Sequence, residues 1–124
     1  MEQNILDQII EASGEVHRLL GGPGLLENIY ETALCYELQL RGLTSQRQLP
    51  IPVVYKGTCV REPLFLDILV EKKVIVEVKA TGKDYPIYRA QLLTYLRLTN
   101  TKIGLLVDFG RFTLKEGICV VSNT

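Results

Sequence analysis

The spacing of apolar residues predicts two helices in the first third of the chain. Between residues 4 and 20 apolar side chains recur at three- and four-residue intervals, which is the period of one helix face. The run 21–24, Gly-Gly-Pro-Gly, then interrupts the pattern, because glycine and proline break regular structure. A second helical stripe covers about 25–41, and Gly42 suits the position just after a helix.

The middle of the chain is typical of β-strands. Residues 48–57 are β-rich, but Pro50 and Pro52 restrict them to a sheet edge or an irregular start. Two apolar runs, 64–70 and 74–80, flank the short polar segment 71–73 and predict a β-hairpin.

The last third predicts one helix and two strands. The helix covers about 85–98, with Pro86 in its first turn, where proline is tolerated. Residues 102–109 have the pattern of a buried strand, and 112–121 add another. The order α-α-β-β-β-α-β-β predicts an α/β (α+β) protein with a mixed β-sheet flanked by helices. The length of 124 residues predicts a single domain over 1–124.

Strand alternation predicts which side chains of the hairpin share a face. Asp67 lies on the face opposite Leu64, Leu66, Ile68 and Val70. In the second strand Glu77 and Lys79 share a face with Ile75. A turn centred on Lys72 gives these pairs: Val70 with Val74, Leu69 with Ile75, Ile68 with Val76, and Asp67 with Glu77.

The pairing of Asp67 with Glu77 indicates metal chemistry. Opposed side chains lie about 4.5–5.5 Å apart, and two carboxylates that close repel each other. A divalent cation with oxygen ligands, Mg²⁺ or Mn²⁺, would compensate them. Lys79 lies about 7 Å further along the strand and can reach a phosphate or a water. The alternative is an edge hairpin with a solvated charged face, in which Lys79 bridges the two acids.

Two helical residues are candidates to complete the site. Glu27 lies beside the apolar stripe of the second helix, although a carboxylate in a first turn also suits the helix dipole. Gln91 shares a face with Tyr88, Tyr95 and Leu98 in the third helix. It either reaches the same cleft or is a polar residue satisfied in packing.

Composition and charge narrow the function classes. The chain is 47% hydrophobic and 23% charged, which excludes a disordered or collagen-like protein. Lys+Arg and Asp+Glu number 14 each, so nucleic-acid binding depends on a local basic patch. The candidate phosphate contacts are Arg61, Lys83, Arg89 and Arg97.

Targeting signals are not apparent. No apolar run approaches the roughly 18 residues that cross a bilayer, and residues 1–10 lack the features of a signal peptide. We therefore expect a cytoplasmic protein without membrane contact. Cys35, Cys59 and Cys119 are odd in number and widely spaced, which predicts reduced, buried thiols. A catalytic cysteine with His17 as its base is the alternative, without local sequence support.

The motifs resemble those of the GxxExxY protein family. The signature stands as Gly24-Leu-Leu-Glu27-Asn-Ile-Tyr30, and further matches follow at 47–57, 66–70, 75–80, 90–96 and 104–109. The resemblance covers about 14–121. That family is similar to the PD-(D/E)XK nuclease superfamily, whose core is an αβββαβ arrangement.

The resemblance implies roles for five residues. Asp67 and Glu77 are then metal ligands, Lys79 is the catalytic lysine, Glu27 is a helical acid that binds the metal directly or through water, and Gln91 is the helical glutamine beside the site. Three departures accompany it: an extra glycine within 20–24, Tyr88-Arg89 where relatives commonly have His and a polar residue, and Asp108 in place of Asn.

Three functions follow in order of preference. The first is a Mg²⁺- or Mn²⁺-dependent nuclease or phosphodiesterase acting on DNA or RNA. The second is a non-catalytic module of the same fold that binds nucleic acid or protein. The third is a structural or regulatory interaction protein. A homodimer is compatible with all three.

Overall fold

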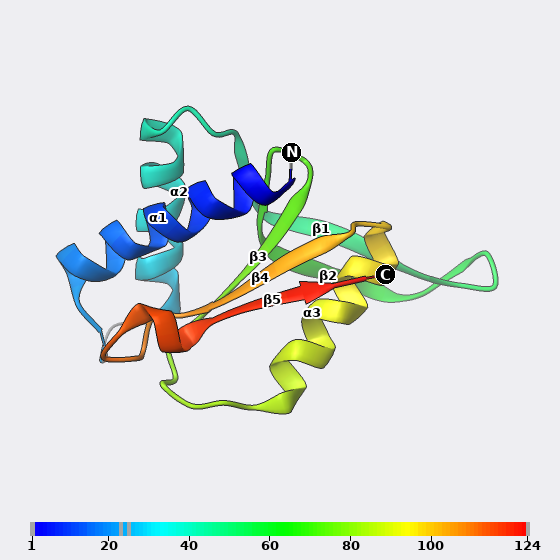
Figure 1. Ribbon diagram of the computed structural model, residues 1–124. Coiled ribbons are helices and arrows are strands. Elements are labelled where there is room, and N and C mark those ends of the chain that lie inside the picture. The colour runs from blue at the N-terminus through cyan, green and yellow to red at the C-terminus, as the bar shows by residue number, and fades with distance from the viewer. Residues whose placement is uncertain (1, 23, 25, 124) are drawn as a thin grey trace.

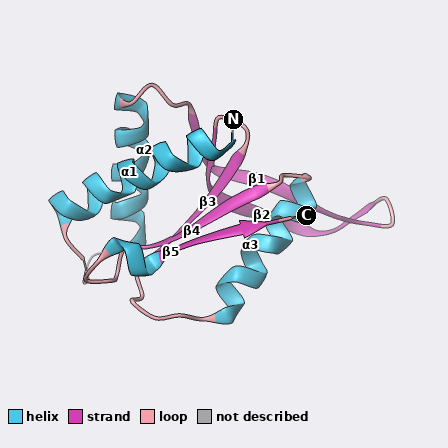
Figure 2. Ribbon diagram, in the orientation of Figure 1, coloured by secondary structure: helices cyan, strands magenta, loops and turns pink. Residues whose placement is uncertain are grey.

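The computed structural model of the protein describes residues 2–22, 24 and 26–123. Helix α1 (Glu2–Leu20) and helix α2 (Glu27–Leu40) precede three strands, β1 (Ser45–Tyr55), β2 (Thr58–Val70) and β3 (Val74–Lys79). Helix α3 (Pro86–Thr99) then leads to β4 (Ile103–Asp108), a short 3-10 helix η1 (Leu114–Gly117) and β5 (Ile118–Ser122). The predicted order of helices and strands is confirmed, and so is the α+β class (Figure 2).

The strands form one five-stranded mixed sheet in the order β1-β2-β3-β4-β5. Strands β3 and β4 are parallel because α3 provides the crossover between them, and the other neighbours are antiparallel. The edge position that Pro50 and Pro52 predicted is confirmed, since β1 begins the sheet.

Two apolar layers hold helices on opposite faces of the sheet (Figure 1). Side chains of α1 and α2, such as Ile9 and Leu34, pack on Val76 and Leu105. On the other face Leu92 and Leu96 of α3 pack on strand residues that include Ile75 and Leu106.

Strand β2 is longer than the predicted 64–70, and it pairs with β1 in a hairpin that the sequence pattern did not predict. Strand β2 begins at Thr58, six residues before the predicted start. Its first half was not recognised as a strand because Arg61, Glu62 and Pro63 form a polar stretch there. Lys56 and Gly57 both have positive φ, 51° and 78°, as a two-residue type I′ turn requires. The resulting β1–β2 arm extends beyond the rest of the sheet (Figure 1).

The predicted register of the β2–β3 hairpin is confirmed for three pairs, Val70 with Val74, Leu69 with Ile75, and Ile68 with Val76. The predicted common face of Leu66, Ile68 and Val70 is wrong. Leu66 packs in the α3 layer, while Ile68 and Val70 pack in the α1–α2 layer. Alternation breaks at Asp67, where β2 leaves β3 and where Gln48 of β1 has a φ of 50°.

The last strand is shorter than the predicted 112–121. Residues 114–117 form η1, and only Ile118–Ser122 pair with β4. Gly117 permits this turn, because a Cβ there would lie 2.3 Å from the carbonyl oxygen of Asp108. None of the described helices has the length and apolarity needed to cross a membrane.

Candidate functional site

Asp67 and Glu77 meet where β2 and β3 separate. The Asp67 carboxylate accepts a hydrogen bond from the backbone amide of Val78 at 2.8 Å. In return, the amide of Asp67 donates to Oε1 of Glu77 at 3.2 Å. The two side chains therefore replace the ladder hydrogen bonds that would continue the hairpin, and the predicted backbone pairing of Asp67 with Glu77 is absent from the described ladder.

The environment disfavours the ionised form of Glu77. The side chain is 7% exposed, and burial followed by the charge of Asp67 raises its pKa to about 8. Tyr95 of α3 adjoins the same pair, since burial and then the charges of Glu77 and Asp67 raise its pKa. Two negative charges on this pair are therefore unfavourable in the partly apolar setting, and a bound cation would relieve that cost.

Lys79 links the carboxylates to α3. Its ammonium nitrogen lies 4.5 Å from the centroid of the Tyr88 ring, a cation–π contact. Its charge also acts to lower the pKa values of Glu77 and Glu27. The ammonium therefore lies within electrostatic reach of both acids.

Glu27 begins helix α2, so the predicted helical start near residue 25 moves two residues along the chain. Residues 23 and 25, next to the additional glycine in the sequence, lie outside the described residues. Burial raises the pKa of Glu27 most, and the charges of Asp67 and Asp108 raise it further. Glu27 and Asp67 also line one pocket together with Asn28, Glu31, Gln48 and Val78.

Tyr30 anchors the start of α2 against the sheet. Its hydroxyl donates to the carbonyl oxygen of Gly21 at 2.7 Å, and its ring stacks on Phe109 with centroids 4.7 Å apart. Phe109 directly follows β4. The buried tyrosine of the Gly24–Tyr30 motif therefore helps to hold Glu27 beside the ends of β3 and β4.

The carboxylate pair suits a hard divalent cation with oxygen ligands. Among the described residues no three His, Cys, Asp or Glu side chains converge as a metal-binding group. Each carboxylate of the pair accepts a hydrogen bond from one backbone amide, and the two carboxyl groups also interact with each other. Mg²⁺ commonly binds one or two carboxylates together with waters and substrate phosphates, and the pair fits that pattern.

Gln91 and the cysteines stand apart from this pair. Gln91 is exposed on α3, and no hydrogen bond within the described residues joins it to Asp67, Glu77 or Lys79. All three cysteines are free thiols, but the prediction that they are buried is wrong: Cys59 is exposed on the projecting arm, and Cys35 and Cys119 are only partly buried. The His17 ring contacts the carbonyl oxygen of Arg111 at 2.7 Å.

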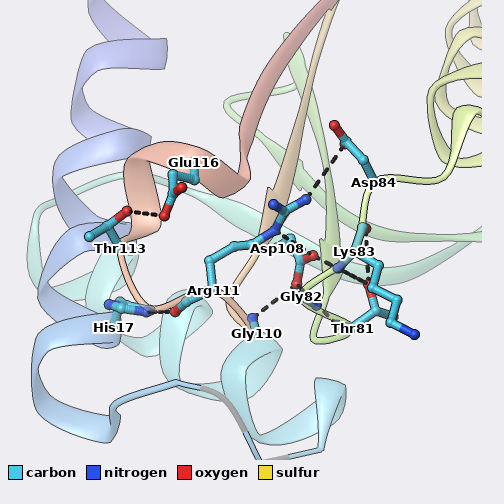
Figure 3. A network of polar contacts seen from close by, with 10 residues as sticks. All are labelled: His17, Thr81, Gly82, Lys83, Asp84, Asp108, Gly110, Arg111, Thr113 and Glu116. Carbon is cyan, nitrogen blue, oxygen red and sulfur yellow. Dashed lines mark hydrogen bonds and ion pairs between the residues drawn. The ribbon is translucent and has the colours of Figure 1, made fainter.

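Asp108 was noted in the sequence only as a departure. Its carboxylate accepts from the backbone amides of Thr81 at 3.0 Å, Gly82 at 3.2 Å and Gly110 at 2.9 Å, and from Nε of Arg111 at 3.3 Å (Figure 3). This buried acid joins the loop after β3 to the loop after β4. The feature of the sequence that could have identified Asp108 is a carboxylate at the end of an apolar strand.

Glu31 was missed as well. It lies one turn after Glu27 and is 6% exposed. It accepts from Gln48 Nε2 at 2.9 Å and from Arg47 at 3.2 Å. It thereby secures β1 at the kink beside Asp67. Nothing near Glu31 in the sequence indicates its contacts with Arg47 and Gln48, which lie 16 and 17 residues further along the chain.

Comparison with known proteins places the chain in a family. The model of the PD-(D/E)XK nuclease superfamily matches residues 3–121. No curated protein and no solved structure matches the chain. PD-(D/E)XK nucleases generally use divalent metal ions, and their substrates are nucleic acids. Since the match covers nearly all of the chain and the fold agrees with it, the chain belongs to the PD-(D/E)XK nuclease superfamily.

Proposed function

We propose that this protein is a metal-dependent nuclease that hydrolyses phosphodiester bonds in DNA or RNA. The observation that supports it most is the mutual contact of the Asp67 and Glu77 carboxylates with the β3 and β2 backbones, beside Lys79. Placing the buried Glu77 against the half-buried Asp67 costs folding free energy unless a cation compensates their charge. Membership of a nuclease superfamily gives the pair a chemical purpose.

The roles follow from position. Asp67 and Glu77 hold Mg²⁺ or Mn²⁺, and Glu27 supports it from α2. The metal, when bound, supplies a water of lowered pKa and neutralises charge on the phosphate. Lys79 donates to the attacking water or to a phosphate oxygen, and its contact with the Tyr88 ring orients the ammonium. Gln91 is proposed as a further polar contact to substrate from α3.

A titration of Mn²⁺ into metal-free protein, followed by calorimetry, tests the ligand assignment. We expect saturable binding in the native protein and in Glu62→Gln, a control that removes an exposed acid from the same strand. Asp67→Asn and Glu77→Gln should both lose it. Binding that survives in both variants would place the metal elsewhere.

Cleavage assays on DNA and RNA, single- and double-stranded, then test the activity. Cleavage that needs Mg²⁺ or Mn²⁺ and is lost in Asp67→Asn and Glu77→Gln supports the nuclease. Nucleic-acid binding without cleavage by the native protein, under any of these metals, would favour the non-catalytic module of the same fold. We also propose that the chain forms a single domain and that two copies associate as a homodimer. Neither assay depends on these two proposals.

A further inference from the structure

Lys79 lines a second pocket, to which Glu27 does not contribute. It lies at the carboxyl ends of β3 and β4, beside the first turn of α3. Four cationic side chains from four different segments line it: Lys79, Lys83, Arg89 and Arg111. The Tyr88 ring and the backbone around Gly117 complete its walls.

The acids of this pocket are already engaged. Asp108 accepts from three backbone amides and from Arg111. Glu116 accepts from the Thr113 hydroxyl at 2.6 Å. Figure 3 shows the Arg111 guanidinium between the carboxylates of Asp108 and Asp84, which lie 3.3 and 3.6 Å from it. Arg111 offsets one of these three carboxylates, and the four cations and three acids of the pocket together leave one net positive charge.

The remaining cations have no such partners. Within the described residues, no ion pair includes Lys79, Lys83 or Arg89. In Figure 3 no dashed line reaches the ammonium group of Lys83. Three cations that make no described ion pair, at the rim of a pocket whose net charge is positive, favour an anion.

We propose that this pocket binds a second phosphate of the nucleic acid, one that neighbours the phosphate at the Asp67–Glu77 pair. The inference rests on the proposed function, because a nucleic-acid strand carries one phosphate per nucleotide and Lys79 borders both places. Lys83 and Arg89 are the contacts that belong to this subsite alone. The pocket thereby sets the position of the nucleic-acid strand relative to the carboxylates of Asp67 and Glu77.

Equilibrium binding in EDTA tests the subsite without cleavage. The probes are short fluorescent single-stranded DNA and RNA oligonucleotides, each with and without a 5′-terminal phosphate. Lys83→Gln and Arg89→Gln should each weaken binding about 5- to 10-fold at low salt and lower the slope of log K against log salt by about 0.7. If the variants lose affinity only for the 5′-phosphorylated probes, the subsite binds a terminal phosphate. If they lose affinity equally for probes with and without that group, the subsite binds an internal phosphate. Either result supports the subsite.

Matched controls separate a site from diffuse attraction. Lys102→Gln removes an exposed lysine just before β4, and Lys72→Gln an exposed lysine from the β2–β3 turn. Both should change affinity less than about twofold, since surface charges far from a contact are screened. Equal losses in the controls, or none in Lys83→Gln and Arg89→Gln, overturn the subsite.

The proposed nuclease is judged separately, by metal-dependent cleavage with native protein. Cleavage that is unaffected by Lys83→Gln and Arg89→Gln overturns the subsite and leaves the nuclease standing. A native protein that neither binds any probe nor cleaves overturns both. Circular dichroism melting confirms that each variant is folded.

Discussion

The backbone amide of Asp67 donates to the Glu77 carboxylate at 3.2 Å, at the point where β2 and β3 separate. The exchange is reciprocal across the two strands, because the Asp67 carboxylate accepts from the amide next to Glu77. Each acid is thus held by the main chain of the other strand. Neither side chain needs a basic residue to fix its orientation, which leaves Lys79 available for a substrate or a water.

The buried Glu77, in contact with Asp67, predicts that metal-free protein loses stability as pH rises. The folded state keeps Glu77 protonated up to a pKa of about 8, whereas the ordinary value is 4.5. The folded state therefore binds more protons than the unfolded chain between these values, and the free energy of unfolding falls as pH increases across that range. Melting temperatures in EDTA should show this decline in the native protein.

Glu77→Gln is the control for that decline, because glutamine has no proton to lose. Its melting temperature should vary less over the same pH range and exceed that of the native protein at the alkaline end. Mn²⁺ should restore stability to the native protein and leave the variant unchanged. Parallel curves for the two proteins in EDTA would contradict the assignment of the titration to Glu77.

Lys79→Ala should separate chemistry from metal binding. The ammonium is not a metal ligand, so calorimetric binding of Mn²⁺ should persist, while the cleavage rate at saturating substrate falls about 10²- to 10³-fold. Lys73→Ala, in the turn at the other end of β3, should leave the rate unchanged. Retained cleavage in Lys79→Ala would remove this residue from the catalytic group.

Asp108→Ala should destabilise the protein by about 3 kcal/mol, because three backbone amides and Arg111 lose a buried acceptor together. Asp108→Asn keeps one acceptor oxygen and should cost less. Urea unfolding measures both free energies. Equal, small effects would mean that water replaces the carboxylate and that the two loops are held by other contacts.

Gly22 should not tolerate a side chain. A Cβ there would lie 2.2 Å from the carbonyl oxygen of Phe109 and 2.8 Å from that of Arg111. Gly22→Ala must therefore push the end of α1 away from the loop after β4, at a cost of about 2 kcal/mol. Gly14→Ala, where a Cβ meets no atom within 4 Å, should instead stabilise α1 by roughly 0.5–1 kcal/mol. Urea unfolding should give shifts of opposite sign.

Local patterns were sufficient for most of the secondary structure. The apolar period marks α1, Pro86 marks the first turn of α3, and the three apolar pairs fix the register of β2 with β3, because these signals depend on neighbours a few residues apart. The first half of β2 was missed because Arg61, Glu62 and Pro63 lie on a projecting arm, where burial does not select apolar residues.

The sequence by itself determined the element order, the hairpin register and the nearness of Asp67, Glu77 and Lys79, since all three lie within 13 consecutive residues on two adjacent strands. Only the tertiary structure decided that Asp67 departs from strand alternation, because that depends on the left-handed Gln48 of β1 and on Glu31 of α2. It also decided that Asp108 joins two loops and that Lys83 and Arg89 share a pocket. These contacts join residues far apart in the chain, and no local period encodes the packing that brings them together.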